Sequence, residues 1–395
     1  MKILYLTTVL PSKRKTGGEI ASQCFINAFK QSGHEVLIVG YQRKNDTPVK
    51  NHCEISVAER YIETDKARFY PIFWMLLSLI KNLPYSSAKY YSKTYVAKVK
   101  SLLYSEDFDV VVIDHAQLGW LKNLVSDQDK LIFICHNVEH KIYLAQSENM
   151  RNYIARLIYK REARLIKGME NKLANTAKEV WTFTLNDSRY VSSVKKRGGV
   201  RVFAVPSSLI ILPDRTPKLK NCDVGIIGTW TWKPNMEGLK WFFQSVYPHL
   251  LADLSIQVAG KGAEWLHGQY SNVKYCGFVP SAQAFMEQAK VIAIPSISGG
   301  GVQIKTLDAI ASGSPVVATP VALRGISEYP SSVVVAERPD DFANSLTQLV
   351  TLLTAQDFYR DGISWSQNRR EEFFADVAEA IETFQSEKVL IAVGK

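Results

Sequence analysis

The stretch VIAIPSISGGGVQIKTLDAIASGSPVVAT, residues 291–319, is the most informative part of this chain. An apolar run ends at Pro295 and three consecutive glycines follow. An amphipathic helix is then predicted from about Val302 to Gly313, with Pro315 just beyond it and a second apolar run after that. Strand, glycine-rich loop, helix and strand in this order are typical of a parallel α/β sheet. We therefore expect a βαβ unit here.

The glycine-rich loop is suited to phosphate. It consists of Gly299, Gly300, Gly301 and Val302. Glycines let backbone N–H groups approach an anion, and a helix N-terminus adds about half a positive charge. Lys305 and Asp308 are three residues apart on the helix and share a face, so one suits a diphosphate and the other a pair of ribose hydroxyls. A nucleotide-sugar is expected here, and an ordinary βαβ turn with a solvated lysine is the simpler alternative.

Composition agrees with a two-domain protein in the cytoplasm. The chain has 395 residues, of which 46% are hydrophobic, enough for two cores. Its five cysteines are odd in number and have no metal-ligand spacing, which is typical of reduced thiols. The apolar part of residues 1–12 is too short for a signal peptide. No run approaches the roughly 18 apolar residues that span a bilayer.

The net charge of +10 is concentrated in the first half of the chain. Residues 1–200 carry 31 Lys and Arg against 19 Asp and Glu, whereas residues 201–395 carry 17 against 19. An aromatic-rich apolar run at 69–80 precedes several lysines, and residues 151–167 add six more cations. Such a surface suits peripheral contact with an anionic membrane, at the inner face of the plasma membrane. A buried helix beside a solvated charged face is the open alternative. No nucleic-acid motif accompanies the charge, so nucleic acid is not an expected partner.

Strands alternate with helices through both halves, as doubly wound parallel sheets require. Strands are predicted at 2–7, 35–39, 109–113, 130–135, 179–184 and 200–205, and then at 222–227, 255–259, 273–275, 291–294, 316–318 and 333–335. The fold class is therefore α/β with two Rossmann-like domains. Their predicted ranges are 1–205 and 222–364, joined by a linker at 206–221 that is rich in Pro, Ser and Lys and followed by a helical segment at 365–395.

The motifs resemble those of family 4 glycosyltransferases, retaining enzymes of the GT-B fold. The similarity is to the subgroup with GGG-x-x-x-K-x-L-E/D followed by A-x-A-x-G-x-P-V-V, of the bacterial exopolysaccharide and lipid-linked glycan type. The matching residues are Gly299, Gly300, Gly301, Lys305, Leu307, Asp308, Ala309, Ala311, Gly313, Pro315, Val316 and Val317. The resemblance implies an acceptor-binding first domain facing a nucleotide-sugar-binding second domain across a cleft, with the C-terminal helix crossing back to the first. The commonest family pattern has two glutamates, but Gly300 stands where the first would be and Asp308 replaces the second.

Two motifs of the first half lie where catalytic groups are expected. Gly17 and Gly18 open a helix, and the resemblance implies that they face the donor diphosphate or the acceptor. The predicted strand ending at residue 135 delivers His136 within the sequence His-Asn-Val-Glu, which resembles the family loop whose histidine approaches the donor hexose. His136 is therefore the main catalytic candidate, with His115 and Glu139 as further ones. A structural role is the alternative for any histidine after a strand. The next residue after Glu139, a histidine, is expected to face solvent.

The start of the second domain resembles the family turn G-x-x-x-W-x-P-N, with Gly228 and Trp232 in the matching places. Many relatives carry an arginine and a lysine that grip phosphate where this chain has Thr229 and Asn235. We therefore expect Lys305 to supply the missing cationic contact and count it among the catalytic candidates.

Two further segments are candidates for donor contact. Lys261, between two glycines, offers a second phosphate contact, and an ordinary turn with an exposed lysine is the alternative. Phe278 and Val279 resemble the family segment whose backbone reads the edge of the nucleobase.

The expected function is transfer of a hexose, glucose favoured, from a nucleotide-sugar, UDP-sugar favoured, to a lipid-linked sugar acceptor in polysaccharide biosynthesis. The resemblance implies a hexosyltransferase that retains anomeric configuration. No Asp-x-Asp pair is placed to hold a metal with the diphosphate, so neither a metal nor another cofactor is expected. A UDP-sugar epimerase of the same fold and a non-catalytic nucleotide-sugar or lipid-binding protein are the alternatives. NAD chemistry is disfavoured because no G-x-G-x-x-G follows the first strand.

Overall fold

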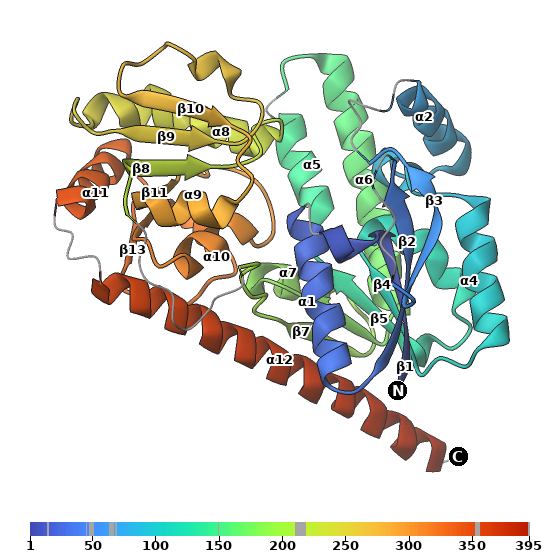
Figure 1. Cartoon of the computed structure of the whole chain (residues 1–395). Helices are drawn as coiled ribbons and strands as arrows, with labels where there is room; N and C mark the ends of the chain where they lie inside the picture. Colours follow the sequence, from blue (N-terminus) through green and yellow to red (C-terminus); the bar gives the residue numbers. More distant parts are fainter. Residues whose placement is uncertain are drawn as a thin grey trace. The chain divides into compact units, whose positions relative to one another are not determined.

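A computed structural model describes residues 1–13, 16–44, 46, 51–62, 67, 69–148, 150–209, 219–351 and 356–393, with the backbone alone at 356–359 and 387–393. The chain forms two compact units (Figure 1). Unit 1 comprises Met1–Phe203 together with Phe373–Lys395, and unit 2 comprises Ala204–Glu372. Of the predicted linker at 206–221, residues 210–218 lie outside the described residues.

Unit 1 is built on a parallel sheet which, in the described part of the chain, has seven strands in the order β3-β2-β1-β4-β5-β6-β7. The strands are β1 (Lys2–Val9), β2 (Glu35–Arg43), β3 (Glu54–Arg60), β4 (Val110–Asp114), β5 (Leu131–Cys135), β6 (Glu179–Thr182) and β7 (Gly199–Val202). The helices are α1 (Gly17–Gln31), α2 (Tyr70–Lys81), α3 (Tyr85–Ala88), α4 (Lys93–Ser105), α5 (Glu139–Glu148), α6 (Tyr153–Thr176) and α7 (Leu185–Val194). Short 3-10 helices lie at Pro11–Lys13, Ala116–Leu124 and Gln128–Lys130.

Both faces of this sheet are covered, because successive side chains of a strand point to opposite faces. Leu4 and Leu6 of β1 belong to a buried cluster that also holds Val99 of α4. Tyr5, between them, packs its ring edge-on against Phe29 of α1 at 6.4 Å. Alternate side chains of β1 therefore contribute to the hydrophobic cores on both faces of the sheet.

Unit 2 repeats the plan with six parallel strands in the described residues, ordered β10-β9-β8-β11-β12-β13. The strands are β8 (Cys222–Ile227), β9 (Ile256–Ala259), β10 (Val273–Gly277), β11 (Ala289–Ile294), β12 (Val316–Ala318) and β13 (Val333–Val335). The helices are α8 (Lys233–Trp241), α9 (Ala282–Gln288), α10 (Ile304–Ala311) and α11 (Pro339–Thr351), with short helical turns at Phe242–Val246, Tyr247–His249, Glu264–Leu266 and Pro320–Leu323. Helix α12 (Gln356–Val393) contributes to both units.

The predicted α/β architecture with two Rossmann-like domains is confirmed. All twelve predicted strands are present, with ends shifted by a few residues. In each sheet the chain first adds strands on one side of the first strand and then continues on its other side. This change occurs between β1 and β4 in unit 1 and between β8 and β11 in unit 2. In open α/β sheets, ligands bind at the carboxyl ends of the strands at such a switch point. Each unit therefore has one predictable location for a functional site.

Candidate functional site

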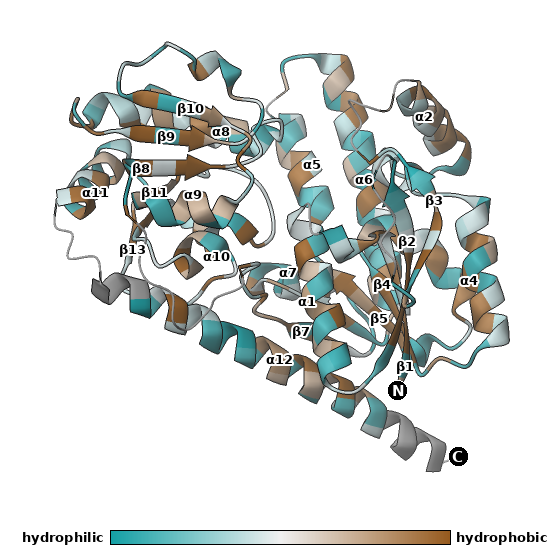
Figure 2. Ribbon diagram, in the orientation of Figure 1, coloured by the Kyte–Doolittle hydropathy of each residue, from teal (hydrophilic) through white to brown (hydrophobic). Residues whose placement is uncertain are grey.

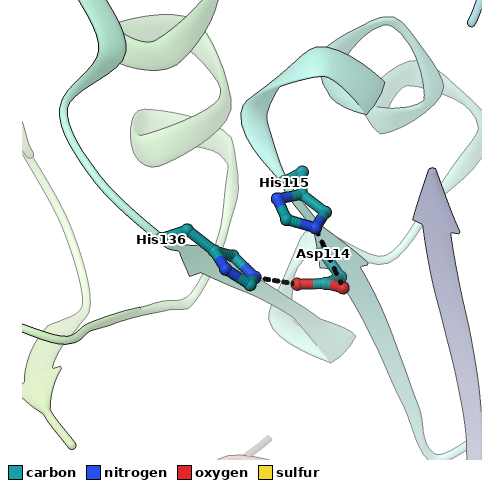
Figure 3. A group of neighbouring side chains, drawn as sticks. All are labelled: Asp114, His115 and His136. Atoms are coloured by element: carbon teal, nitrogen blue, oxygen red, sulfur yellow. Dashed lines mark hydrogen bonds and ion pairs between the residues drawn. The ribbon is translucent and has the colours of Figure 1, made fainter. Parts of the chain in front are cut away.

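The switch point of unit 1 carries a buried carboxylate between two histidines (Figure 3). Asp114 is the last residue of β4, His115 follows it, and His136 follows the neighbouring strand β5. His136 Nε2 lies 2.6 Å from Asp114 Oδ1, and the His115 and His136 rings stack with centroids 3.8 Å apart. The structure therefore brings two of the predicted catalytic residues together on one carboxylate.

Asp114 has further hydrogen-bond partners that keep it ionised. Thr7 Oγ1 donates to Asp114 Oδ2 at 3.0 Å, and Ser22 Oγ donates to the same oxygen at 2.5 Å. Burial alone raises the pKa of Asp114, but the nearby His115 and His136 and the hydrogen bonds from His136 and Ser22 outweigh it and lower the pKa to about 2. For His115, burial and the neighbouring His136 lower the pKa to about 4, against the opposing effect of Asp114. The site thus holds a carboxylate and a neutral His115 at neutral pH.

The two histidines face the glycine turn at the start of α1. A Cβ at Gly18 would lie 3.1 Å from His115 Cε1 and 4.0 Å from His136 Nδ1. The side-chain oxygen of Thr16 caps the helix here by accepting from the Glu19 backbone N–H at 3.4 Å. Gly18 therefore lies directly against the imidazole pair, where a larger residue would press on His115.

The same three side chains have the spacing of a metal site, since the ligand atoms of Asp114, His115 and His136 lie within 4.8 Å of one another. However, both oxygens of Asp114 already accept hydrogen bonds, from His136 on one side and from Thr7 and Ser22 on the other. A cation bound here would have to replace the His136 contact. The hydrogen bonds of Asp114 are therefore better suited to orienting the His136 ring than to binding a metal ion.

Glu139 belongs to a separate network one turn further along. Its carboxylate accepts from Gln117 Nε2, and its backbone N–H donates to Glu170 Oε1 at 2.7 Å. Burial, followed by the nearby Glu170, raises the pKa of Glu139 to about 8. The prediction that His140 faces solvent is wrong: its ring is buried and Nδ1 lies 2.7 Å from Glu170 Oε2. Glu170 on α6 therefore holds the start of α5 in place.

The switch point of unit 2 carries the glycine-rich loop. This loop follows β11 and leads into α10, which begins at Ile304, two residues later than the predicted Val302. Gly299 and Gly301 have φ of 117° and 64°, the left-handed region that glycine adopts without strain. Arg324 follows the short helix that comes after β12, and its Nη1 donates to the Gly299 carbonyl. This hydrogen bond connects the glycine-rich loop to the segment after β12. No side chain caps α10 at its N-cap, Gln303. The loop therefore has the backbone shape that an anion site needs.

The side chain of Lys305 is directed toward Asn235, one of the two positions at which the sequence resemblance led us to expect a cation. Its Nζ donates to Asn235 Oδ1 at 2.9 Å, and Asn235 Nδ2 donates to the Thr229 carbonyl at 3.0 Å. Burial lowers the pKa of Lys305 to about 8. The Lys305 ammonium therefore lies beside Asn235, which is itself hydrogen-bonded to the Thr229 carbonyl.

Asp308, on the same helix, has partners that sequence reasoning did not identify. Its Oδ1 accepts from Ser207 Oγ at 2.9 Å and from the Ser208 backbone N–H at 2.7 Å, and its Oδ2 accepts from Ser208 Oγ at 2.7 Å. Burial raises the pKa of Asp308 against these hydrogen bonds. Two serine hydroxyls thus make the contacts predicted for a ribose diol, and a diol that binds Asp308 has to replace or share them.

The remaining predicted donor contacts lie along the neighbouring loops of unit 2. Gly228 follows β8, and a Cβ there would lie 2.8 Å from the Trp230 ring. Trp232 and Lys261 are exposed, and the Lys261 ammonium lies 5.2 Å from the centre of the exposed Phe278 ring. Val279, after β10, is partly buried. No contact joins Lys261 to the glycine-rich loop among the described residues.

Comparisons with known proteins agree with this architecture. Residues 221–351 match the family model described as glycosyl transferases group 1. A protein of Klebsiella pneumoniae, described as an uncharacterized 44.6 kDa protein in the cps region, is 23% identical over 343 residues, 82% of this chain and 84% of that protein.

Two solved structures are similar over nearly the whole chain. Sucrose-phosphate synthase (tll1590) from Thermosynechococcus elongatus has a TM-score of 0.63 at 15% identity and covers 100% of both chains. Anabaena Alr3699/HepE, in complex with UDP and glucose, has a TM-score of 0.62 at 13% identity and covers 98% of this chain and 100% of that one. At such identities the likeness concerns the fold. The chain therefore has the two-domain GT-B fold, and its residues 221–351 match the family model of group 1 glycosyl transferases.

Proposed function

We propose that this protein is a hexosyltransferase of the retaining family 4 type, in the GGG-x-x-x-K subgroup. It transfers a hexose, glucose favoured, from a UDP-sugar to a lipid-linked sugar acceptor in polysaccharide biosynthesis. The observation that carries the proposal is the position of Lys305, whose ammonium lies 2.9 Å from Asn235 Oδ1 beside the glycine-rich loop. It lies in the domain that matches the group 1 glycosyl transferases.

The chemistry requires positive charge at the leaving group. When the bond between the anomeric carbon and the diphosphate oxygen breaks, negative charge accumulates on UDP. Backbone N–H groups of the loop and the start of α10, together with Lys305, are fixed donors that stabilise this charge without reorganisation. We propose that these groups take the place of a metal ion. Phe278 and Val279 read the base, and Asp308 holds the ribose once the serine hydroxyls give way.

In the first domain, we assign His136 to the donor hexose. Asp114 is ionised and can only accept, so His136 Nε2 carries the hydrogen of their 2.6 Å contact. This leaves Nδ1, which faces the Gly18 turn, available to a sugar hydroxyl. The acceptor oxygen bonds to the anomeric carbon on the face that UDP leaves, and its proton passes to a diphosphate oxygen of UDP. Configuration is thereby retained.

Two similarities support the proposed substrates. The Alr3699/HepE structures were solved with UDP, with UDP and glucose, and with UDP-glucose. The Klebsiella relative is assigned to a cps region, which favours polysaccharide assembly.

Binding and product analysis test the proposal. Calorimetry with UDP, GDP, ADP and their hexose conjugates, without metal and then with magnesium, is expected to show UDP-sugar binding that needs no metal. A ligand at a hundredfold excess over its dissociation constant adds about 2.7 kcal/mol of stability, which a thermal shift detects. Transfer to a lipid-linked acceptor is then followed by NMR, and an inverted product contradicts retention.

Two alternatives predict other outcomes in the same assays. A UDP-sugar epimerase converts the donor when no acceptor is present. A non-catalytic binding protein, favoured by Gly300 in place of the first acid, binds UDP-sugar and transfers nothing.

A further inference from the structure

Helix α2 presents apolar side chains to solvent along most of its length. Trp74 and Ser78 are its buried residues, whereas Phe73 is 59%, Leu79 57% and Ile80 78% exposed. The exposed apolar residues are Phe69, just before the helix, and Ile72, Phe73, Met75, Leu76, Leu79 and Ile80 within it. They cover an arc of about 160° of the helix, counted at roughly 100° per residue. A helix of a globular protein normally buries such a face.

The first two turns of α6 continue the exposed apolar surface. Tyr153, Ile154, Leu157 and Ile158 are all exposed, and their spacing places them in one stripe of the helix. One turn further along this stripe, Arg161 Nη1 donates to Ser78 Oγ of α2 at 3.2 Å and Nη2 donates to the Ser78 carbonyl at 3.3 Å. The stripe of α6 therefore leads directly to α2. Figure 2 shows α2 as a predominantly hydrophobic helix at the surface of unit 1.

Cations accompany this surface. The exposed ones are Lys81 at the end of α2 and Arg151, Arg156, Lys160 and Arg164 in and before α6. Residues 66–105 and 149–161 contain no Asp or Glu. Arg156 and Lys160, four apart, form a row beside the apolar stripe of α6. We call the exposed apolar residues of α2 and α6 and these five cations the α2/α6 surface.

We propose that the α2/α6 surface docks on an anionic phospholipid bilayer. Aromatic and aliphatic side chains enter the boundary between headgroups and acyl chains, while lysine and arginine heads stay at the phosphates. Each cation near such a surface contributes to binding, and two signals, apolar and cationic, together give stable attachment. Helices of the described residues are all too short or too polar to span a membrane, so this contact is peripheral.

Charge distinguishes a bilayer from a second copy of the chain as the occupant. In a two-fold dimer the same patch faces itself, so the cationic rows of both copies would meet. No acidic residue in these two segments is available to neutralise them. An anionic lipid surface is complementary to both the apolar and the cationic part.

Vesicle sedimentation tests this inference with the full-length protein and no nucleotide-sugar, so its outcome is independent of the proposed reaction. The protein is mixed with vesicles of phosphatidylcholine alone and of phosphatidylcholine with phosphatidylglycerol. Binding to the anionic vesicles only, weakened by salt, is expected. The double variant Arg156→Gln with Lys160→Gln should bind about 30-fold more weakly, from two surface cations. Phe73→Gln with Ile80→Gln should lose binding at any salt concentration.

Matched variants control for general loss of charge or apolar area. Leu185→Gln replaces an exposed leucine of α7, and Lys196→Gln with Lys240→Gln removes two exposed cations from other elements. These should bind as the unaltered protein does, and circular dichroism verifies that all variants are folded. The inference is overturned if anionic vesicles do not bind, if the controls lose as much binding as the test variants, or if Phe73→Gln with Ile80→Gln abolishes self-association and leaves vesicle binding intact.

Discussion

Nε2 of His136 lies 2.6 Å from Oδ1 of Asp114. The two residues lie at the ends of different strands, separated in sequence by the connection from β4 to β5 and by β5 itself. The contact exists because Asp114 ends β4, His136 follows β5, and these strands are neighbours in the sheet with Asp114 opposite Ile134. A buried carboxylate at the base of an imidazole determines which nitrogen carries the hydrogen. It thereby directs Nδ1 toward the turn at Gly18.

Asp114→Asn is expected to lower the rate of sugar transfer by about 10- to 100-fold, which is less than the roughly 100- to 10,000-fold of an acid–base group itself, because Asp114 acts through His136. The amide removes the charge that orients His136 in unit 1, whereas the proposed nucleotide site belongs to unit 2. Steady-state kinetics together with UDP calorimetry measure both quantities: kcat should fall while the affinity for UDP is unchanged. Ser22→Ala, which removes one donor to the same carboxylate, should show a smaller loss. Unchanged kcat in Asp114→Asn would mean that the network is purely structural.

Gly18→Ala tests the close approach of the α1 turn to the histidines. The added methyl would lie 3.1 Å from His115 Cε1, so it presses on the imidazole pair and displaces the groups that we assign to the donor hexose. We expect transfer to fall at least tenfold while the melting temperature changes little, because the site is at the surface end of α1. Gly33→Ala serves as a contrast at the other end of the helix: nothing lies within 4 Å of the added methyl, but φ is 79°, so the cost should appear in stability and not in activity.

Lys305→Met is expected to stabilise the free protein and to impair nucleotide binding. Because burial holds the pKa of Lys305 at about 8, below the ordinary 10.5, the charged form is disfavoured in the fold. An uncharged side chain of similar length relieves this cost, by about 2 kcal/mol after allowing for partial exposure of the residue. The affinity for UDP should drop about 10- to 100-fold with the loss of a charge-assisted contact. A variant that is less stable and binds UDP normally would refute the assignment of Lys305 to the diphosphate.

The pH dependence of stability should reveal the neutral His115. Its pKa in the fold is about 4, whereas the unfolded chain has the ordinary value of 6.5. The unfolded state therefore binds more protons between these values, and stability is lost as pH falls from 6.5 toward 4. The loss between pH 7 and pH 5 is about 2 kcal/mol, or roughly 4–8 °C in melting temperature. Asp114 does not contribute in this window, because its pKa is lowered from 3.8 to about 2 and its stabilisation is lost only as pH falls through that range.

His115→Asn is the matched variant for this measurement. Asparagine tolerates the φ of 76° that His115 adopts, and it has no proton to gain. Calorimetry at pH 7 and pH 5 should show a smaller decrease in melting temperature for the variant than for the unaltered protein. Equal decreases would indicate that other histidines, such as His34, dominate the acid response.

Much of the fold follows from local sequence signals, and the exceptions have physical causes. Strands buried on both faces, such as β4 and β5, are continuous apolar runs that are easily identified. The strand at Glu54–Arg60 escaped prediction because it lies at the sheet edge, where charged side chains are tolerated, and three of its seven residues are charged. Helix α10 starts after Val302 because the loop keeps two glycines in left-handed conformations up to Gly301.

The candidate sites were predictable where a motif lies within one loop. His136 directly follows β5, and Gly299–Gly301 and Lys305 form one continuous motif between β11 and β12, so both are visible in the sequence. The partners Ser22, Ser207 and Asn235 were not identified as such, because each meets its partner only through the packing of a distant element. Asp114 could have been identified as a candidate from the sequence, since it precedes His115 at the end of a predicted strand. Only the pairing of β4 with β5 shows that its carboxylate is hydrogen-bonded to His136.

Nucleotide affinity should itself depend on pH through Lys305. The diphosphate binds the ammonium form, and its negative charge raises the pKa of Lys305 above the value of about 8 in the free protein. UDP is fully ionised above pH 7, since the second phosphate pKa is about 6, so it contributes little to the change. Affinity is therefore highest near pH 7 and decreases as pH rises through 8, by about tenfold between pH 7 and pH 9. Isothermal titration with UDP at several pH values measures this. In Lys305→Arg the guanidinium stays charged throughout, so the profile should be flat even where the affinity is lower. A decrease of the same size in Lys305→Arg would assign the titration to another group.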